Sequence, residues 1–300
     1  MAKLILDYCT DKSLIVDNEL NDLLKIVKKH DEELIEKTIR ESHDYPVLFN
    51  LKKERGNILI PCAVSKNDDC LEVGSECGAI TVSLVNASKF LDCIELSKQK
   101  SEINYERNFD RNNLNIYVGD FSSVASELAK KYDKIFLLGA LKQASMYMPN
   151  SESPFMDMLA LAKSLLKPNG QLFIAIENKY GMKYFNGARE DDTGNVFESI
   201  EGYKASDVKT FSSVQLRKML SESGFESVYF YYPLPDYKFA NMIYSEDYLP
   251  MMDGVANVGH SMDYDRTIIF DEDKALMEAS QAGVFEVFAN SFLIKAGVKK

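Results

Sequence analysis

Residues 71–81 read LEVGSECGAIT, and this stretch decides the fold. The apolar residues before Gly74 predict a buried strand, and Gly74 and Gly78 predict a tight turn. The residues after Gly78 predict the start of a helix. Acidic residues occupy two places, Glu72 at the strand end and Glu76 inside the turn. A strand, a glycine turn and a helix in this order form the framework of many sites for nucleotide-like ligands.

The carboxylate of Glu76 indicates which ligand class the turn suits. A turn that binds pyrophosphate offers bare backbone N–H groups and the positive end of a helix, and a carboxylate there repels phosphate. In a dinucleotide pattern beginning at Gly74, the second glycine falls on Glu76 and the third on Ala79. The pattern therefore disfavours an NAD-dependent oxidoreductase. A nucleoside with positive charge and no phosphate fits better, and S-adenosylmethionine is such a ligand.

Composition narrows the class of protein. The 300 residues are 46% hydrophobic and 27% charged, as in ordinary globular proteins, and the formal net charge is −11. This acidity argues against general binding to nucleic acid, which needs a basic face. The five cysteines contain no C-x-x-C pair, so we expect neither a disulfide framework nor a metal site. There is no signal-peptide pattern and no apolar run long enough to span a membrane, so the expected location is cytoplasmic.

From residue 69 onward, short apolar runs alternate with amphipathic segments. This alternation predicts an α/β fold with a doubly wound, Rossmann-like sheet of parallel strands and crossover helices. Ligands of such sheets bind at the carboxyl ends of the strands. The predicted strands are 70–73, 90–94, 114–118, 133–138, 171–176 and 227–232, and the predicted helices are 78–88, 97–109, 122–131, 154–167 and 212–223.

The remaining segments surround this unit. Residues 1–64 are predicted to form a helical N-terminal cap, because their leucines recur at helical spacing. Residues 65–300 are predicted to be one domain that contains the sheet. Segments near 178–210 and 233–284 exceed the minimal unit and are predicted to be lid or substrate-binding insertions. The apolar segment 285–294 is expected to return as the closing strand.

Acidic residues follow two further predicted strands. Glu95 comes 21 positions after Gly74, about where an acid binds ribose hydroxyls in such folds, although it can also be a solvated acid at a strand end. Asp120 ends the third strand and is placed to accept from an adenine amine, with Phe121 on the ring face. The other interpretation of Asp120 is a cap of the helix that follows.

Together these motifs resemble those of class I S-adenosylmethionine-dependent methyltransferases. The family's first motif has the form acid-x-Gly-x-Gly-x-Gly, which Glu72, Gly74 and Gly78 match, while Glu76 replaces the middle glycine. The resemblance covers roughly residues 69–232 and implies a seven-stranded methyltransferase sheet with S-adenosylmethionine as cofactor. The cofactor-binding residues that it implies are Glu72, Gly74, Ser75, Glu76, Gly78, Glu95, Leu96, Gly119, Asp120, Phe121 and Gly139.

A narrower resemblance extends beyond these motifs. The stretches IENKYGMKYF (176–185), EDDTG (190–194), YYPLPDYK (231–238) and FANSF (288–292) resemble bacterial methyltransferases associated with surface-polysaccharide and glycosyltransferase systems. This resemblance implies a sugar or glycan hydroxyl, or another small molecule, as methyl acceptor. It also implies a glycosyltransferase as a candidate partner.

Methyl transfer from a sulfonium requires alignment of acceptor and methyl group, and a hydroxyl acceptor also benefits from a general base. Candidate catalytic residues follow the fourth and fifth strands or lie in the late insertion. Each has a structural alternative, such as orienting a loop or lying at the surface. The main candidates are Glu177, Asn178, Asp191 and His260, with Lys142, Tyr180 and Asp192 as further ones.

The sequence therefore predicts an S-adenosylmethionine-dependent O-methyltransferase. Glu76 motivates an alternative from another class, because its side chain can fill the methionine pocket instead of pairing with the cofactor's ammonium. In that case the chain is a non-catalytic module that keeps the fold and serves a glycosyltransferase partner.

Overall fold

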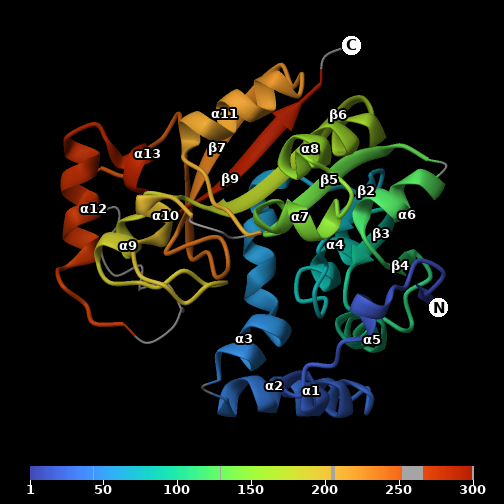
Figure 1. Ribbon diagram of the computed structural model, residues 1–300. Helices are drawn as coiled ribbons and strands as arrows, with labels where there is room; N and C mark the ends of the chain where they lie inside the picture. The colour runs from blue at the N-terminus through green and yellow to red at the C-terminus, as the bar shows by residue number, and fades with distance from the viewer. Residues whose placement is uncertain (43, 129, 204–206, 252–265, 299–300) are drawn as a thin grey trace.

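The computed structural model describes residues 1–42, 44–128, 130–203, 207–251 and 266–298. Nine strands of these residues form one sheet in the order β1-β4-β3-β2-β5-β6-β9-β7-β8 (Figure 1). The strands are β1 (Lys3–Ile5), β2 (Asp69–Val73), β3 (Phe90–Glu95), β4 (Leu114–Val118), β5 (Tyr132–Leu138), β6 (Leu166–Glu177), β7 (Ser227–Leu234), β8 (Met242–Ser245) and β9 (Ser291–Gly297).

The sheet has a parallel half and an antiparallel half. Strands β1 to β6 pair in parallel, and β9 inserts antiparallel between β6 and β7. The chain passes from β2 outward to β3 and β4, then returns to the other side of β2 at β5. The α/β, doubly wound prediction is therefore confirmed, and each of the seven predicted strands has a counterpart in the sheet. The predicted closing strand 285–294 is wrong in its first half, because α13 (Phe285–Phe288) is helical and the strand begins only at Ser291. Two short edge strands, β1 and β8, add to the predicted seven.

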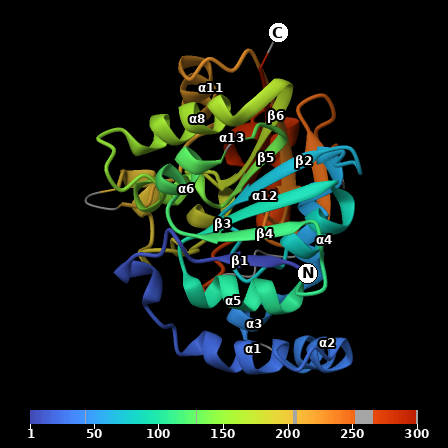
Figure 2. The ribbon, with the colours of Figure 1, turned by 90° about the vertical axis from the view of Figure 1, so that its right-hand side faces the viewer.

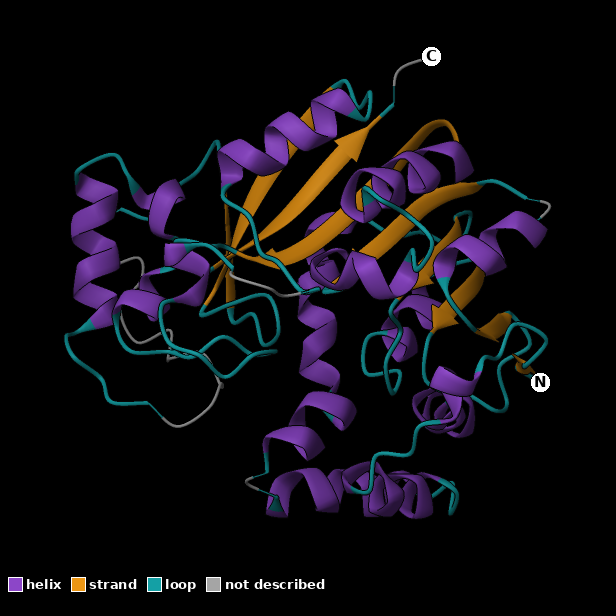
Figure 3. Cartoon of the chain, in the orientation of Figure 1, coloured by secondary structure: helices purple, strands orange, loops and turns teal. Residues whose placement is uncertain are grey.

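Helices cover both faces of the sheet, as the alternation of side chains along its strands requires. On one face, Leu71 and Val73 of β2 pack with residues of α6 (Phe121–Glu127), α8 (Pro154–Leu165) and α11 (Ser213–Glu222). On the other face, Cys70 packs with η2, a 3₁₀ helix (Lys53–Cys62), and with α4 (Thr81–Ala87). Figure 3 shows the fanned strands between these helices.

The N-terminal residues contain α1 (Glu19–Val27), α2 (Glu32–Glu41) and α3 (Tyr45–Leu51). Helix α1 packs along α5 (Lys98–Arg107), and Figure 2 shows α1 and α2 below α5. The segment before them is not helical throughout, because β1 joins the sheet beside β4. The division into a cap of residues 1–64 and a domain of residues 65–300 stays a prediction.

Both predicted insertions form structure beside the sheet. The first contains α9 (Met182–Phe185) and α10 (Glu198–Glu201), and the second contains β8 and α12 (Glu272–Gln281), followed by α13 (Phe285–Phe288). Helix α12 contacts both α9 and α13, so the two insertions meet (Figure 1). His260 lies outside the described residues. No helix among the described ones has the length and apolar character to cross a membrane.

Candidate functional site

A cavity of about 510 Å³ lies where β2 and β5 end and extends to the N-terminal helices. Its position at the carboxyl ends of central parallel strands is the one expected for a ligand site in this fold. The predicted residues Gly74, Glu76, Gly139 and Asp191 line it. The full lining is Asp17, Glu19, Leu20, Tyr45, Pro46, Phe49, Asn50, Arg55, Gly74, Glu76, Lys100, Leu138, Gly139, Ala140, Lys142, Gln143, Tyr147, Asp191, Asp192, Tyr237 and Lys238.

The glycine turn can carry no side chain at its two glycines. Gly74 has φ of +80°, and a Cβ there would lie 3.0 Å from both the Ala140 Cβ and the Tyr147 hydroxyl. Gly78 has φ of +81°, and its Cβ would lie 2.2 Å from the Asn104 Oδ1. Backbone strain and close packing therefore both require glycine. At Gly74 this leaves bare backbone at the cavity wall.

The carboxylate of Glu76, which the sequence left as an anomaly, is paired. Glu76 has φ of +49°, and its side chain forms an ion pair with Lys100 of α5. Its backbone N–H donates to the Glu95 Oε2 at 2.9 Å. The Glu76–Lys100 pair therefore presents both signs of charge at the cavity wall instead of an isolated negative charge.

Two further acids behind the turn are buried. Burial raises the pKa of Glu72 to about 7, and its Oε2 accepts from the Thr81 hydroxyl at 2.6 Å. Burial is the main cause that raises the pKa of Glu95 to about 7, and the negative charge of Glu76 is the second. Both Glu95 oxygens accept backbone N–H bonds, from Glu76 and from Ser97. Ser75 is also buried, and its Oγ has no hydrogen-bond partner among the described residues.

The predicted adenine side is packed against protein. Tyr8 lies against Gly119, where an added Cβ would be 2.7 Å from the Tyr8 Cβ. Asp120 caps α6, accepting from the Ser123 N–H and from two serine hydroxyls. Phe121 is fully buried in the core, and Leu96 packs partly buried against the same core. Thus Asp120 takes the capping role, and Phe121 packs in the core instead of presenting a ring face to the cavity.

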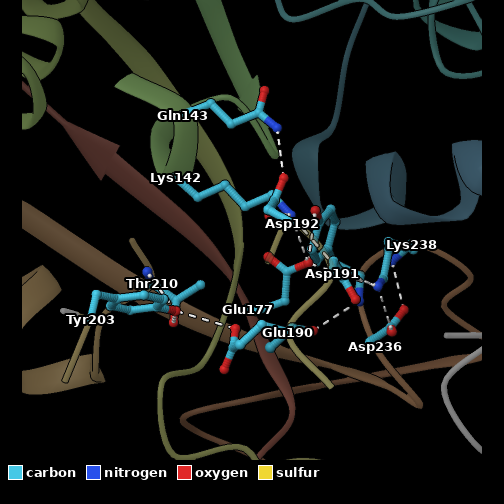
Figure 4. A network of polar contacts seen from close by, with 12 residues as sticks. Lys142, Gln143, Glu177, Glu190, Asp191, Asp192, Tyr203, Thr210, Asp236 and Lys238 are labelled. Atoms are coloured by element: carbon cyan, nitrogen blue, oxygen red, sulfur yellow. Dashed lines mark hydrogen bonds and ion pairs between the residues drawn. The ribbon is translucent and has the colours of Figure 1, made fainter. Parts of the chain in front are cut away.

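Four charged residues of the cavity wall, Lys142, Asp191, Asp192 and Lys238, belong to a network of polar contacts (Figure 4). Lys142 follows β5, and its Nζ lies 2.9 Å from Asp192 and 3.3 Å from Glu177. The Lys238 Nζ lies 2.7 Å from Asp191. Burial opposes ionisation of Asp191, but Lys238 and its neighbouring lysines outweigh it and hold the Asp191 pKa well below its usual range. Asp191 is therefore a permanent anion that fixes Lys238.

Glu177 ends β6 beneath this cluster and is 1% exposed. Burial raises its pKa to about 7, with Lys142 lowering it and Asp191 raising it. Its Oε1 accepts from the Tyr237 hydroxyl at 3.4 Å. Tyr237 lines the cavity, whereas Glu177 is not among the lining residues. Glu177 therefore reaches the cavity through Tyr237 and Lys142.

Asn178, also predicted to be catalytic, ties two segments together. Its Nδ2 donates to the carbonyls of Val287 and Ala289, at 2.7 and 2.8 Å, and its Oδ1 accepts the Tyr180 N–H. It is buried and is not among the cavity-lining residues. The structure gives it the loop-orienting role, the structural alternative stated for it.

Among the cavity-lining residues that the sequence did not nominate for the site are Arg55, Tyr237 and Lys238. Arg55 and Tyr237 come from segments 182 positions apart, so no local spacing links them. Arg55 stands in the polar run KKERGN (52–57), so its sequence context does not set it apart. Among the described residues, no group of three or more His, Cys, Asp or Glu side chains is arranged to hold a metal ion.

No protein-family model matches the chain. Its structure is similar to that of phosphoethanolamine N-methyltransferase 1 of Haemonchus contortus, solved with phosphoethanolamine and S-adenosylhomocysteine (TM-score 0.49, 13% identity, 92% of this chain and 50% of that one). It is also similar to an S-adenosylmethionine-dependent methyltransferase of Archaeoglobus fulgidus (TM-score 0.49, 14% identity, 89% of this chain and 99% of that one). A third, from Thermotoga maritima, is described as a possible histamine N-methyltransferase (TM-score 0.46, 14% identity, 92% and 99% coverage). This chain spans half the length of the first of these, and the likeness concerns the arrangement of strands and helices alone.

Proposed function

We propose that the protein is an S-adenosylmethionine-dependent methyltransferase that methylates a hydroxyl of a sugar, a glycan or another small acceptor. One observation carries this proposal: a single cavity contacts both the glycine turn at Gly74 and the charged cluster around Lys142 and Asp191. A cofactor at the turn and an acceptor at the cluster would then meet in one space. The choice of a sugar acceptor rests on the sequence resemblance.

The cavity suits the amino-acid and sulfonium part of the cofactor. Its volume of about 510 Å³ lies in the range usual for small-molecule sites. Gly74 lets a ligand approach the backbone closely, and the Glu76–Lys100 pair offers both signs of charge to a zwitterionic ligand. When bound, S-adenosylmethionine supplies a methyl group already activated by a sulfonium.

Tyr237 and Glu177 can remove the proton of an acceptor hydroxyl. The acceptor proton moves to the Tyr237 oxygen while the Tyr237 proton moves to the Glu177 carboxylate, which starts ionised. With the cofactor bound, the acceptor oxygen would take its methyl group and S-adenosylhomocysteine would be left. A base with a pKa of about 7 suits this transfer near neutral pH.

A second candidate function is the non-catalytic module, and the adenine side of the site favours it. Tyr8 packs on Gly119, and both Glu95 oxygens are already bonded to backbone N–H groups. If a ligand cannot displace these contacts, the ribose and adenine of the cofactor cannot bind there. The two candidates therefore differ in whether the cofactor binds at all.

Calorimetry with S-adenosylhomocysteine tests the proposal, with Gly74→Ala as the variant and Gly283→Ala as its matched control. Both glycines have left-handed φ, +80° and +74°, but a Cβ at Gly283 meets only open space. We expect wild type and Gly283→Ala to bind, and Gly74→Ala to bind at least about tenfold more weakly. Failure of the wild type to bind at millimolar ligand would reject the methyltransferase and favour the module. Binding without methyl transfer from labelled cofactor to a panel of sugar acceptors would contradict the choice of acceptor.

A further inference from the structure

Arg55 is a buried cation at the cavity wall. It belongs to η2, is 4% exposed and lines the cavity. Its guanidinium lies over the Phe49 ring, 3.6 Å from the centroid, and its Nη1 donates to the Phe49 carbonyl at 3.1 Å. Among the described residues, its Nε has no hydrogen-bond partner, and no carboxylate forms an ion pair with Arg55. Several of its donors are therefore left for something in the cavity.

Burying such a cation destabilises the folded protein unless a ligand pairs with it. Burial lowers the pKa of Arg55, and the nearest acids, Glu76 and Glu72, already bond to Lys100 and Thr81. Arg107 offers a contrast within the same region. It is held by three backbone carbonyls, those of Asn50, Leu51 and Cys77, and forms part of the packing. Arg55 makes one such bond, so packing does not account for its donors.

The position of Arg55 indicates which anion it takes. Arg107 bridges residues 50–51 to Cys77, so the segment that leads into Arg55 is tied to the glycine turn. Across the cavity, Asp191 and Asp192 would repel an anion on the acceptor. A guanidinium fork matches a carboxylate with two parallel hydrogen bonds, and the stacking on Phe49 fixes the plane of the fork.

We propose that Arg55 binds the carboxylate of the cofactor's amino-acid part and so makes the N-terminal helices part of the cofactor site. This inference rests on the proposed function. It sets the direction of the ligand, with the carboxylate toward η2 and the sulfur toward the cluster at Lys142 and Tyr237. The carboxylate that Arg55 binds could instead belong to the methyl acceptor. The experiment below distinguishes a cofactor carboxylate from an acceptor carboxylate.

The test compares S-adenosylhomocysteine with its decarboxylated analogue, which keeps the amine. For the wild type, we expect loss of the carboxylate to weaken binding about 10- to 100-fold, as for a buried charged hydrogen bond. In Arg55→Met the two ligands should bind within about twofold of each other. The control is Lys53→Met, two positions away, which removes an exposed charge that pairs with Glu36 and should retain the wild-type discrimination.

Two results would overturn the assignment of Arg55. One is an unchanged preference for the carboxylate in Arg55→Met. The other is a wild type that binds both ligands equally. The second comparison uses the wild type alone, so it remains decisive if Arg55→Met does not fold. In that case Arg55→Lys replaces Arg55→Met, and it should show an intermediate preference for the carboxylate if the assignment holds. A wild type that binds neither ligand rejects the proposed function itself, which is a different outcome from binding without discrimination.

Discussion

The hydroxyl of Tyr237 lies 3.4 Å from the Oε1 of Glu177 and connects that buried carboxylate to the cavity. The same hydroxyl approaches Gly139, where an added Cβ would be 3.1 Å away. Tyr237 therefore occupies the floor between the end of β5 and the end of β6. This contact supports the proposed relay, in which Tyr237 passes a proton from the acceptor hydroxyl to Glu177.

Removing the hydroxyl tests the relay. We expect Tyr237→Phe to lower kcat about 100-fold, because general-base assistance is typically worth that much or more. S-adenosylhomocysteine affinity should stay within about twofold, since the ring and its packing remain. The control is Tyr229→Phe, whose hydroxyl bonds to Asp247 on an exposed face. Equal kcat values in the two variants would show that Tyr237 carries no proton.

The pH dependence of kcat tests Glu177. A base must be ionised to accept a proton, so with a pKa of about 7 the rate should rise about tenfold per pH unit below 7 and level above it. Glu177→Gln should remove this rise and lower the plateau. A wild-type profile that is flat from pH 5.5 to 8.5 would contradict the assignment.

Glu72 makes stability depend on pH. Its folded pKa of about 7 lies above the ordinary value near 4.3, so the folded state holds the proton more tightly. The contribution of protonated Glu72 to the free energy of unfolding is fully present below about pH 4. It is lost as the pH rises through 7, and the total loss amounts to about 3 kcal/mol. Urea unfolding at pH 5.5 and 8 should show Glu72→Gln gaining stability over the wild type as the pH rises. Exposed Glu41→Gln serves as the control, and an equal trend there would contradict the prediction.

The Glu76–Lys100 pair should behave as a unit. Lys100→Met leaves the Glu76 carboxylate alone beside Glu95, so both stability and S-adenosylhomocysteine affinity should fall. Adding Glu76→Gln should recover much of the loss, with a coupling energy of about 1 kcal/mol in a double-mutant cycle. Additive losses would indicate that the two side chains act independently. Lys98→Met, on the same helix but outside the cavity lining and paired with the half-buried Glu102, should change neither quantity.

The sequence predicted the centre of the sheet well and its edges poorly. Buried runs such as 135–138 and 173–176 are apolar on both faces, and this pattern is strong. The edge strands β1 and β8 contain three and four residues, too few for any periodicity to appear. Pairing with a neighbour, and not their own composition, makes them strands.

Local motifs also predicted only part of the site. The turn at Gly74 follows from adjacent residues, so the sequence alone could locate it. Arg55 and Tyr237 come together at the cavity only because distant segments fold against each other. Their spacing in the sequence does not predict this. Asp120 and Asn178 illustrate the reverse case, because hydrogen bonds to backbone groups also account for the two residues that chemistry nominates.

The insertion of β9 between β6 and β7 has a consequence for assembly during synthesis. Glu177, at the end of β6, is in register with Ser291 of β9. The β7–β8 hairpin is made earlier but reaches the rest of the sheet only through β9. On the ribosome, the hairpin must therefore wait for residues 291–297 before it can dock, a long-range closure of the kind that slows folding. A nascent chain stopped before Ser291 would hold the glycine turn and Glu177 on the parallel strands, with the β7–β8 hairpin detached from them.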